Sequence, residues 1–210
     1  MLFRSFLERH GEGFLYFSLG TVLQHDRAVE ALAKAGVKIA MQGRLGEKAT
    51  FTILDTVDEV GGDIELASPA WHDTERALRL VDTFSAPRPP VVDMTVPVFS
   101  GGKRINQVGF VVSDEKAVAR RYQELFGIGP WRISPIGKKT DAFLDEQPMP
   151  ESAIPGMAND AAFANWGDIE IELLKPAGGP SAHRRFLDRH GNGIQHVSVG
   201  RQADHDAVVA

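Results

Sequence analysis

The sequence contains no cysteine, and this absence excludes several kinds of chemistry. Without cysteine there are no disulfides, no thiolate metal sites and no cysteine nucleophile, so a metal must bind to His, Glu, Asp or Gln side chains. Basic residues are also few: 23 Lys and Arg stand against 28 Asp and Glu, and they form no basic block. This balance disfavours nonspecific binding to nucleic acids.

Long apolar runs and a phosphate-binding loop are missing as well. No stretch of about 18 apolar residues is present, so the sequence predicts no membrane-spanning segment. Charged residues interrupt residues 1–20, which argues against a signal peptide and favours a cytoplasmic protein. Gly127 and Gly129 end a predicted helix rather than begin one, which excludes a dinucleotide-binding fingerprint.

An internal repeat is the strongest feature that the 210 residues do contain. Residues 5–20 (SFLERHGEGFLYFSLG) and 185–200 (RFLDRHGNGIQHVSVG) are identical at eight of sixteen positions, with an offset of 180. The pair His25-Asp26 recurs at the same offset as His205-Asp206. A fainter repeat relates the first third of the chain to its middle. The sequence therefore predicts two related modules, about 12–70 and 104–176, and the opening of a third from 193.

Each module has the pattern expected for a strand, a helix and three further strands. In the second module, a helix begins at a Ser113 cap and ends at Gly127, and the strands cover 107–112, 131–133, 162–166 and 169–174. The first module repeats this order, with strands at 14–19, 38–42, 49–54 and 63–67 and a helix at 26–35. Another helix, capped by Ser181, ends at Gly191. The predicted fold class is α+β, with repeated βαβββ modules that form cup-shaped, half-barrel mixed sheets with helices on the outer face.

Strand periodicity separates an apolar face from a polar face, because successive side chains point to opposite sides. In the strand at 169–174, for example, Ile171 and Leu173 share one face and Glu170 and Glu172 the other. The polar face is predicted to carry Tyr16, Ser18, Glu65, Gln107, Glu170, Glu172, His196 and Ser198.

These modules resemble the vicinal oxygen chelate superfamily, which includes glyoxalase I, methylmalonyl-CoA epimerase, extradiol dioxygenases and bleomycin-resistance proteins. The segment INQVGFVVSDEKAVARRYQELFGIGPW is similar to a module opening of this superfamily. The segment IEIELLKPAGGPSAHRRFLDRHGNGIQHVSV is similar to the glyoxalase I and epimerase branch. The resemblance implies that two modules close a cup around one divalent metal, which could be Zn, Ni, Co, Mn or Fe.

The same resemblance implies a set of site residues. Gln107, Glu172 and His196 correspond to metal ligands, and Glu172 and Glu65 to the carboxylates that move a proton. Tyr16, Ser18, Ser198 and Glu170 would line the substrate cavity. The remaining histidines, among them His25 and His183, are interpreted as structural residues of helices or linkers.

The domain division follows from the repeat. Residues 1–70 are interpreted as the C-terminal half of a first glyoxalase-like domain, and 71–104 as a helical and then Pro-rich linker, with a helix at 73–84. Residues 105–210 would form a second such domain, with a complete module at 105–176, a connecting helix at 181–190 and a truncated module at 193–210. Because the fold closes in pairs of modules, we expect the sequence to be a piece of a longer tandem protein. If the chain stands alone, we expect a homodimer or pairing of its own modules, the first against the second.

The predicted function is a glyoxalase-like, metal-dependent lyase or isomerase that moves a proton next to a carbonyl of a small substrate. One alternative is a metal-free protein that binds small molecules, as bleomycin-resistance proteins do. A second alternative is an Fe-dependent extradiol dioxygenase. It is less favoured, because Gln107 stands where such a site needs its first histidine.

Overall fold

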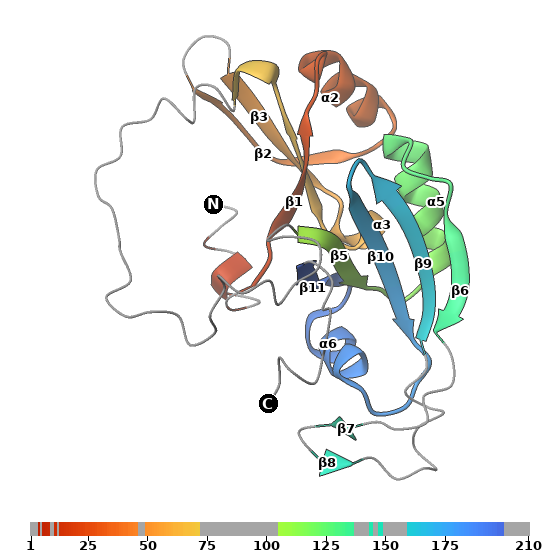
Figure 1. The fold of residues 1–210 in the computed structure, drawn as a ribbon. Coiled ribbons are helices and arrows are strands. Elements are labelled where there is room, and N and C mark those ends of the chain that lie inside the picture. The colour runs from red at the N-terminus through yellow and green to blue at the C-terminus, as the bar shows by residue number, and fades with distance from the viewer. Residues whose placement is uncertain are drawn as a thin grey trace, which may run out of the picture.

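The computed structural model describes residues 4, 6–8, 11, 13–45, 49–71, 105–136, 143–144, 147–148 and 159–199. These residues form two separate mixed sheets with helices packed on them, and a small antiparallel pair of strands at 143–144 and 147–148 (Figure 1). The predicted helix at 73–84, the rest of the linker from residue 72 and residues 200–210 lie outside the described residues.

The first module forms a four-stranded sheet with the order β1-β4-β3-β2. Strand β1 runs parallel to β4, and the other neighbours are antiparallel. Its elements are β1 (Tyr16–Thr21), α2 (His25–Lys34), β2 (Lys38–Leu45), β3 (Ala49–Asp55), α3 (Val57–Val60) and β4 (Asp63–Ala67). The predicted βαβββ order is confirmed, and the short helix α3 is an addition that the sequence pattern did not predict.

The second module forms a five-stranded sheet with the order β11-β5-β10-β9-β6. Strand β10 runs parallel to β5, and β11 pairs antiparallel with the other side of β5. The opening strand of the third module thus joins the sheet of the second. The elements are β5 (Ile105–Val111), α5 (Glu115–Phe126), β6 (Arg132–Ile136), β7 (Phe143–Leu144), β8 (Gln147–Pro148), β9 (Asn159–Trp166), β10 (Ile169–Pro176), α6 (Ala182–His190) and β11 (Gly193–Val199).

The start of α5 differs in detail from the prediction. Asp114, not Ser113, is its N-cap, and the Asp114 carboxylate accepts hydrogen bonds from the backbone N–H groups of Lys116 and Ala117. The backbone of Ser113 instead donates to the side chain of Asn192, just before β11. A carboxylate satisfies two N–H groups of the first turn and carries a favourable negative charge there, which explains why Asp114 takes this role.

The two sheets meet through their apolar faces and share one hydrophobic core. The Phe17 ring of β1 meets the Phe110 ring of β5 edge to face at 6.4 Å, and Phe110 packs in the same way on Tyr122 of α5 at 6.0 Å. At the tight contact between the modules, a Cβ on Gly61 would lie 2.9 Å from Val112 Cγ1. For a chain that stands alone, we expected the first and second modules to close into one cup. The structure differs, because the two modules form separate sheets. Their apolar faces are buried against each other instead.

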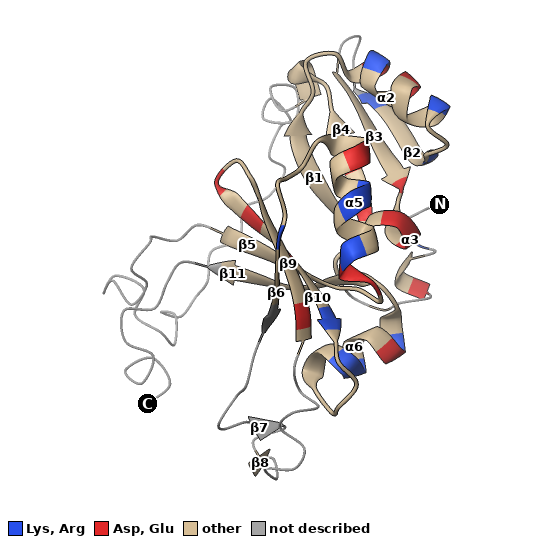
Figure 2. Ribbon diagram, turned by 90° about the vertical axis from the view of Figure 1, so that its right-hand side faces the viewer, with Lys and Arg blue, Asp and Glu red and all other residues tan. Residues whose placement is uncertain are grey.

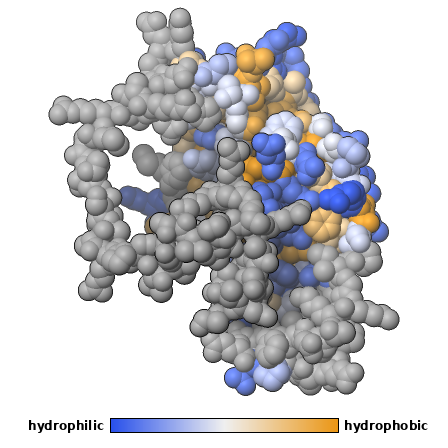
Figure 3. Space-filling model, in the orientation of Figure 1, coloured by the Kyte–Doolittle hydropathy of each residue, from blue (hydrophilic) through white to orange (hydrophobic). Residues whose placement is uncertain are grey.

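Charged residues of both signs are interspersed on α2, α5 and α6 (Figure 2). On the face shown in Figure 3, hydrophilic surface is interrupted by small hydrophobic areas. Large exposed apolar side chains such as Leu23 and Ile133 occur on both modules, as is normal for a folded domain surface. No helix among the described residues is long and apolar enough to cross a membrane.

Candidate active site

A row of functional side chains crosses the polar face of the five-stranded sheet. Residues directly opposite each other on neighbouring strands point to the same side. The register pairs Phe163 with both Arg132 and Glu172, and it pairs Gly109 with both Glu172 and His196. Across β6, β9, β10, β5 and β11, the row therefore consists in order of the Arg132 guanidinium, the Phe163 ring, the Glu172 carboxylate, Gly109 and the His196 imidazole.

Gly109 provides the space that the His196 ring occupies. A Cβ built on Gly109 would overlap Cε1 and Nε2 of His196 and would lie 2.6 Å from its Nδ1. The imidazole thus lies flat against the backbone of β5, and any larger residue at 109 would displace it. This close approach of a ring to a strand glycine is a reason for glycine in the interior of a strand.

The imidazole of His196 is held between two oxygen atoms. Its Nδ1 lies 2.7 Å from Oε1 of Gln195, and its Nε2 lies 3.1 Å from Oε2 of Glu172. The Glu172 side chain is 10% exposed, and that of His196 is 32% exposed. When Nδ1–H donates to Gln195, the lone pair of Nε2 faces a carboxylate oxygen. In the neutral ring one nitrogen carries the proton and the other offers a lone pair. Nε2 can therefore donate to Glu172 or, when the proton is on Nδ1, act as a ligand atom for a cation beside that carboxylate.

A second group of polar side chains, centred on Glu170, lies on the same face in the neighbouring row. Gln107 Nε2 donates to Glu170 Oε1 at 3.0 Å, and Arg132 Nη2 donates to Glu170 Oε2 at 2.8 Å. The Arg132 guanidinium also lies 5.6 Å from the centroid of the Phe163 ring. Gln107 is therefore bound to Glu170 and not to Glu172. With two carboxylates and one guanidinium, this face favours a cation.

Helix α6 covers the end of this face. Phe186 and Leu187 pack on a small apolar cluster that includes Val111 and Leu174. The ring of His183, in the first turn of α6, lies 6.3 Å from that of His196. The sequence favoured a structural role for His183, because this residue lies in the predicted helix before Gly191.

His183 also has a partner on the sheet. Its Nδ1 lies 3.3 Å from the side-chain nitrogen of Asn159, which is buried at the start of β9. Only the packing of α6 against the sheet brings His183 close to His196.

The predicted site residues of the first module lie on a different sheet. Tyr16 pairs with Asp63, and Ser18 with Glu65, where β1 and β4 run side by side. Glu65 is 7% exposed. The structure therefore brings Tyr16, Ser18 and Glu65 together, but in the four-stranded sheet and apart from Glu172. The role of Glu65 as a base stays a prediction for that sheet.

Of the three predicted metal ligands, two are in contact. Glu172 and His196 lie at hydrogen-bond distance, while Gln107 and Ser198 are paired with each other in the next row. Within the described residues, no group of three or more His, Cys, Asp and Glu side chains is arranged to hold a metal ion. The spacing of 3.1 Å between His196 Nε2 and Glu172 Oε2 suits two donors of one cation, and both atom types are ligands for the divalent metals considered above.

A known structure shares this architecture. A triple mutant of 4-hydroxymandelate synthase from Streptomyces coelicolor is similar over 93% of this chain and 51% of its own, with a TM-score of 0.55 and 16% identity. Methylmalonyl-CoA epimerase from Mycobacterium tuberculosis matches 52% of this chain and 60% of its own, with a TM-score of 0.34 and 23% identity. The chain thus spans about half the length of the synthase. No curated protein matches its sequence.

The comparison with the synthase supports the fold alone, because a likeness at such low sequence identity carries no information on the substrate. The family assignment rests on the sequence itself. The profile of the Glyoxalase/Bleomycin resistance protein/Dioxygenase superfamily matches residues 106–210, which is half of the chain and contains the whole five-stranded sheet except for the first residue of β5. The chain therefore belongs to the glyoxalase/bleomycin resistance protein/dioxygenase superfamily.

Proposed function

We propose that the chain is part of a metal-dependent lyase or isomerase that moves a proton next to a carbonyl group of a small substrate. The observation that carries this proposal is the Glu172–His196 pair, in which a carboxylate oxygen and an imidazole nitrogen face each other at 3.1 Å. A divalent cation bound there would supply Lewis acidity that stabilises an enediolate or enolate. Glu172 and His196 would hold this cation.

The surrounding residues orient the pair. Gln195 Oε1 lies 2.7 Å from Nδ1 of His196, and such partners commonly orient a ligating histidine and tune its affinity. The backbone of Gly109 supports the ring from below. Glu172 is nearly buried, so its carboxylate is held in one position and interacts strongly with a positive charge.

Glu170 is the second carboxylate on this face, and we assign it the transfer of the proton. It points to the same side as Glu172, two residues away on β10, and Gln107 and Arg132 hold its two oxygens. A base must lie within hydrogen-bond reach of the proton that it removes, so a substrate bound at Glu172 would extend toward Glu170. The Phe163 ring, between Arg132 and Glu172 in the register, would contact an apolar part of the substrate.

Metal binding tests the first half of this proposal. Titration of metal-free protein with Mn²⁺ in a calorimeter should show about one bound ion per Glu172–His196 pair. Glu172→Gln and His196→Ala should each weaken binding by roughly 10- to 100-fold. His190→Ala is a matched control, because His190 is the last residue of α6 and its ring packs on Phe186, with centroids 4.9 Å apart. Mn²⁺ binding that is absent, or equal in all variants, would refute the proposal and favour a metal-free binding protein.

Proton exchange tests the second half. Carbonyl compounds with an acidic C–H, including methylmalonyl-CoA, can be incubated with Mn²⁺-loaded protein in D₂O and followed by proton NMR. We expect deuterium at the carbon next to the carbonyl, and a loss of exchange in Glu170→Gln with little change in Mn²⁺ affinity. If Glu170→Gln exchanges as fast as the unchanged protein, Glu170 is not the base.

A further inference from the structure

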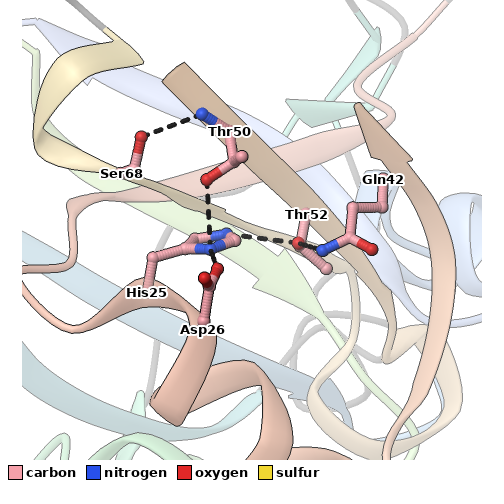
Figure 4. A network of polar contacts seen from close by, with 6 residues as sticks. All are labelled: His25, Asp26, Gln42, Thr50, Thr52 and Ser68. Atoms are coloured by element: carbon pink, nitrogen blue, oxygen red, sulfur yellow. Dashed lines mark hydrogen bonds and ion pairs between the residues drawn. The ribbon is translucent and has the colours of Figure 1, made fainter. Parts of the chain in front are cut away.

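The first module contains a polar network that is separate from the candidate active site on the second module. It is centred on His25, the first residue of α2, whose side chain is only 3% exposed. His25 Nε2 lies 3.2 Å from Thr52 Oγ1, and its Nδ1 lies 2.9 Å from Asp26 Oδ1 and 3.3 Å from Thr50 Oγ1 (Figure 4). Gln42 of β2 extends the network by donating to Thr52 Oγ1 at 3.1 Å. The imidazole thus ties the first turn of α2 to β2 and β3.

A pocket of about 560 Å³ opens beside this network. Its volume lies within the range of roughly 300–1,000 Å³ that is typical of small-molecule sites. The wall combines the first turn of α2 with the strand ends that carry Arg44, Thr50 and Ser68. The hydroxyl of Ser68 accepts a hydrogen bond from the backbone N–H of Thr50 at 2.9 Å, which fixes the inner side of the wall (Figure 4).

The described residues that line the pocket carry a charge opposite to that of the chain. The chain has a net charge of −5, yet these lining residues include two guanidinium groups, Arg27 and Arg44, and one carboxylate, Asp26. Arg27 donates to the neutral side chain of Gln24 at 2.8 Å. Among the described residues, neither guanidinium is paired with a carboxylate. Two such groups on one pocket favour an anion, and guanidinium is suited to phosphate oxygens.

We propose that this pocket binds the phosphate group of a small phosphorylated molecule. Arg27 of α2 and Arg44 of β2 are the charge partners of the phosphate, and Thr50 and Ser68 contribute polar atoms. The pocket is larger than a phosphate ion, which leaves room for the organic part of the ligand. His25 is a positioning residue, because it fixes α2 against β3 and so sets the place of Arg27 relative to Arg44.

The sequence repeat extends into this network. The pair His25-Asp26 recurs as His205-Asp206 at the offset of 180 that relates the first module to the third. The proposal does not depend on the Glu172–His196 pair, which lies on the other sheet.

Phosphate binding can be measured on the whole chain by ¹H–¹⁵N NMR at constant ionic strength, with inorganic phosphate as the probe. We expect saturable shifts at the amides of Thr50 and Ser68. Arg27→Gln and Arg44→Gln should each raise the dissociation constant about tenfold or more, as expected for loss of a charge-assisted hydrogen bond. Lys34→Gln is the matched control: it removes the same charge from the other end of α2, where Lys34 pairs with Glu30, and should leave the constant unchanged.

A variant with the opposite effect separates binding from damage to the fold. Asp26→Asn removes the only carboxylate among the described residues that line the pocket and should tighten phosphate binding, although it weakens the anchor of His25. Equal affinities in the Arg27→Gln, Arg44→Gln and Lys34→Gln variants would overturn the proposal, as would shifts that do not saturate. Malonate that binds as tightly as phosphate would overturn the assignment to phosphate.

Discussion

The space above Gly109 makes a sharp test of the predicted metal site. In Gly109→Ala, the new methyl group would lie 2.6 Å from Nδ1 of His196 and closer still to Cε1 and Nε2. Non-bonded heavy atoms are normally about 3.5–4.0 Å apart, so the ring must move by about 1 Å or turn. Such a shift breaks the 3.1 Å approach of Nε2 to Glu172.

Two consequences should follow from the Gly109→Ala substitution. Overpacking should lower the free energy of unfolding by about 1–3 kcal/mol, measured by urea denaturation. The displaced imidazole should weaken Mn²⁺ binding by about 10- to 100-fold, measured by calorimetry under conditions where the variant is fully folded.

Gly43→Ala is a matched control for the steric effect. A Cβ on Gly43 would overlap Cε1 of Phe51 and lie 2.6 Å from its Cζ, a clash of the same size on the first sheet. We expect Gly43→Ala to lose stability and to keep its Mn²⁺ affinity. Equal Mn²⁺ affinity in the Gly109→Ala variant and the unchanged protein would refute the reasoning, because it would show that the position of His196 does not matter.

Two further predictions concern α5. Asp114→Ala should cost about 1 kcal/mol of stability at pH 7, since the cap to Lys116 and Ala117 is lost. The hydrogen bond from the Ala117 N–H lowers the pKa of Asp114 below its ordinary value of 3.8, so the stabilisation is present above that pH and is lost as the pH falls below it. The difference between the two proteins in urea denaturation should therefore shrink below about pH 3.8; a constant difference would contradict the cap. Burial raises the pKa of Tyr122, whose hydroxyl has no hydrogen-bond partner among the described residues. Tyr122→Phe should be neutral or stabilise the protein by about 1 kcal/mol in thermal unfolding, and a clear destabilisation would reveal a partner for the hydroxyl.

Local patterns were sufficient to predict the elements and their faces. Alternation along β10 separates Glu170 and Glu172 from Ile171 and Leu173. In the structure, the side chains of Ile171 and Leu173 are fully buried. The ends of α5 and α6 follow from Gly127 and Gly191. These features depend on backbone sterics and on short-range periodicity, which the sequence carries directly.

Contacts between distant residues were harder to predict. Strand periodicity placed Glu172 and His196 on polar faces, but only the pairing of β11 with β5 and of β5 with β10 brings them within 3.1 Å. The interpretation of His25 as a structural helix residue missed its contacts with Thr50 and Thr52, because these hydroxyls lie more than twenty residues further along the chain.

The sequence by itself therefore determined the repeat, the βαβββ modules, the polar faces and the superfamily. The tertiary structure decided which strands share a sheet and which faces meet. The apolar faces of both modules, represented by Phe17 and Phe110, are more stable buried against each other than exposed to water. Glu65 and Glu172 lie on separate sheets, because β4 pairs with β1 and β3 while β10 pairs with β5 and β9. Strand pairing and the packing of faces both depend on residues far apart in the chain, so no single segment of the sequence contains them.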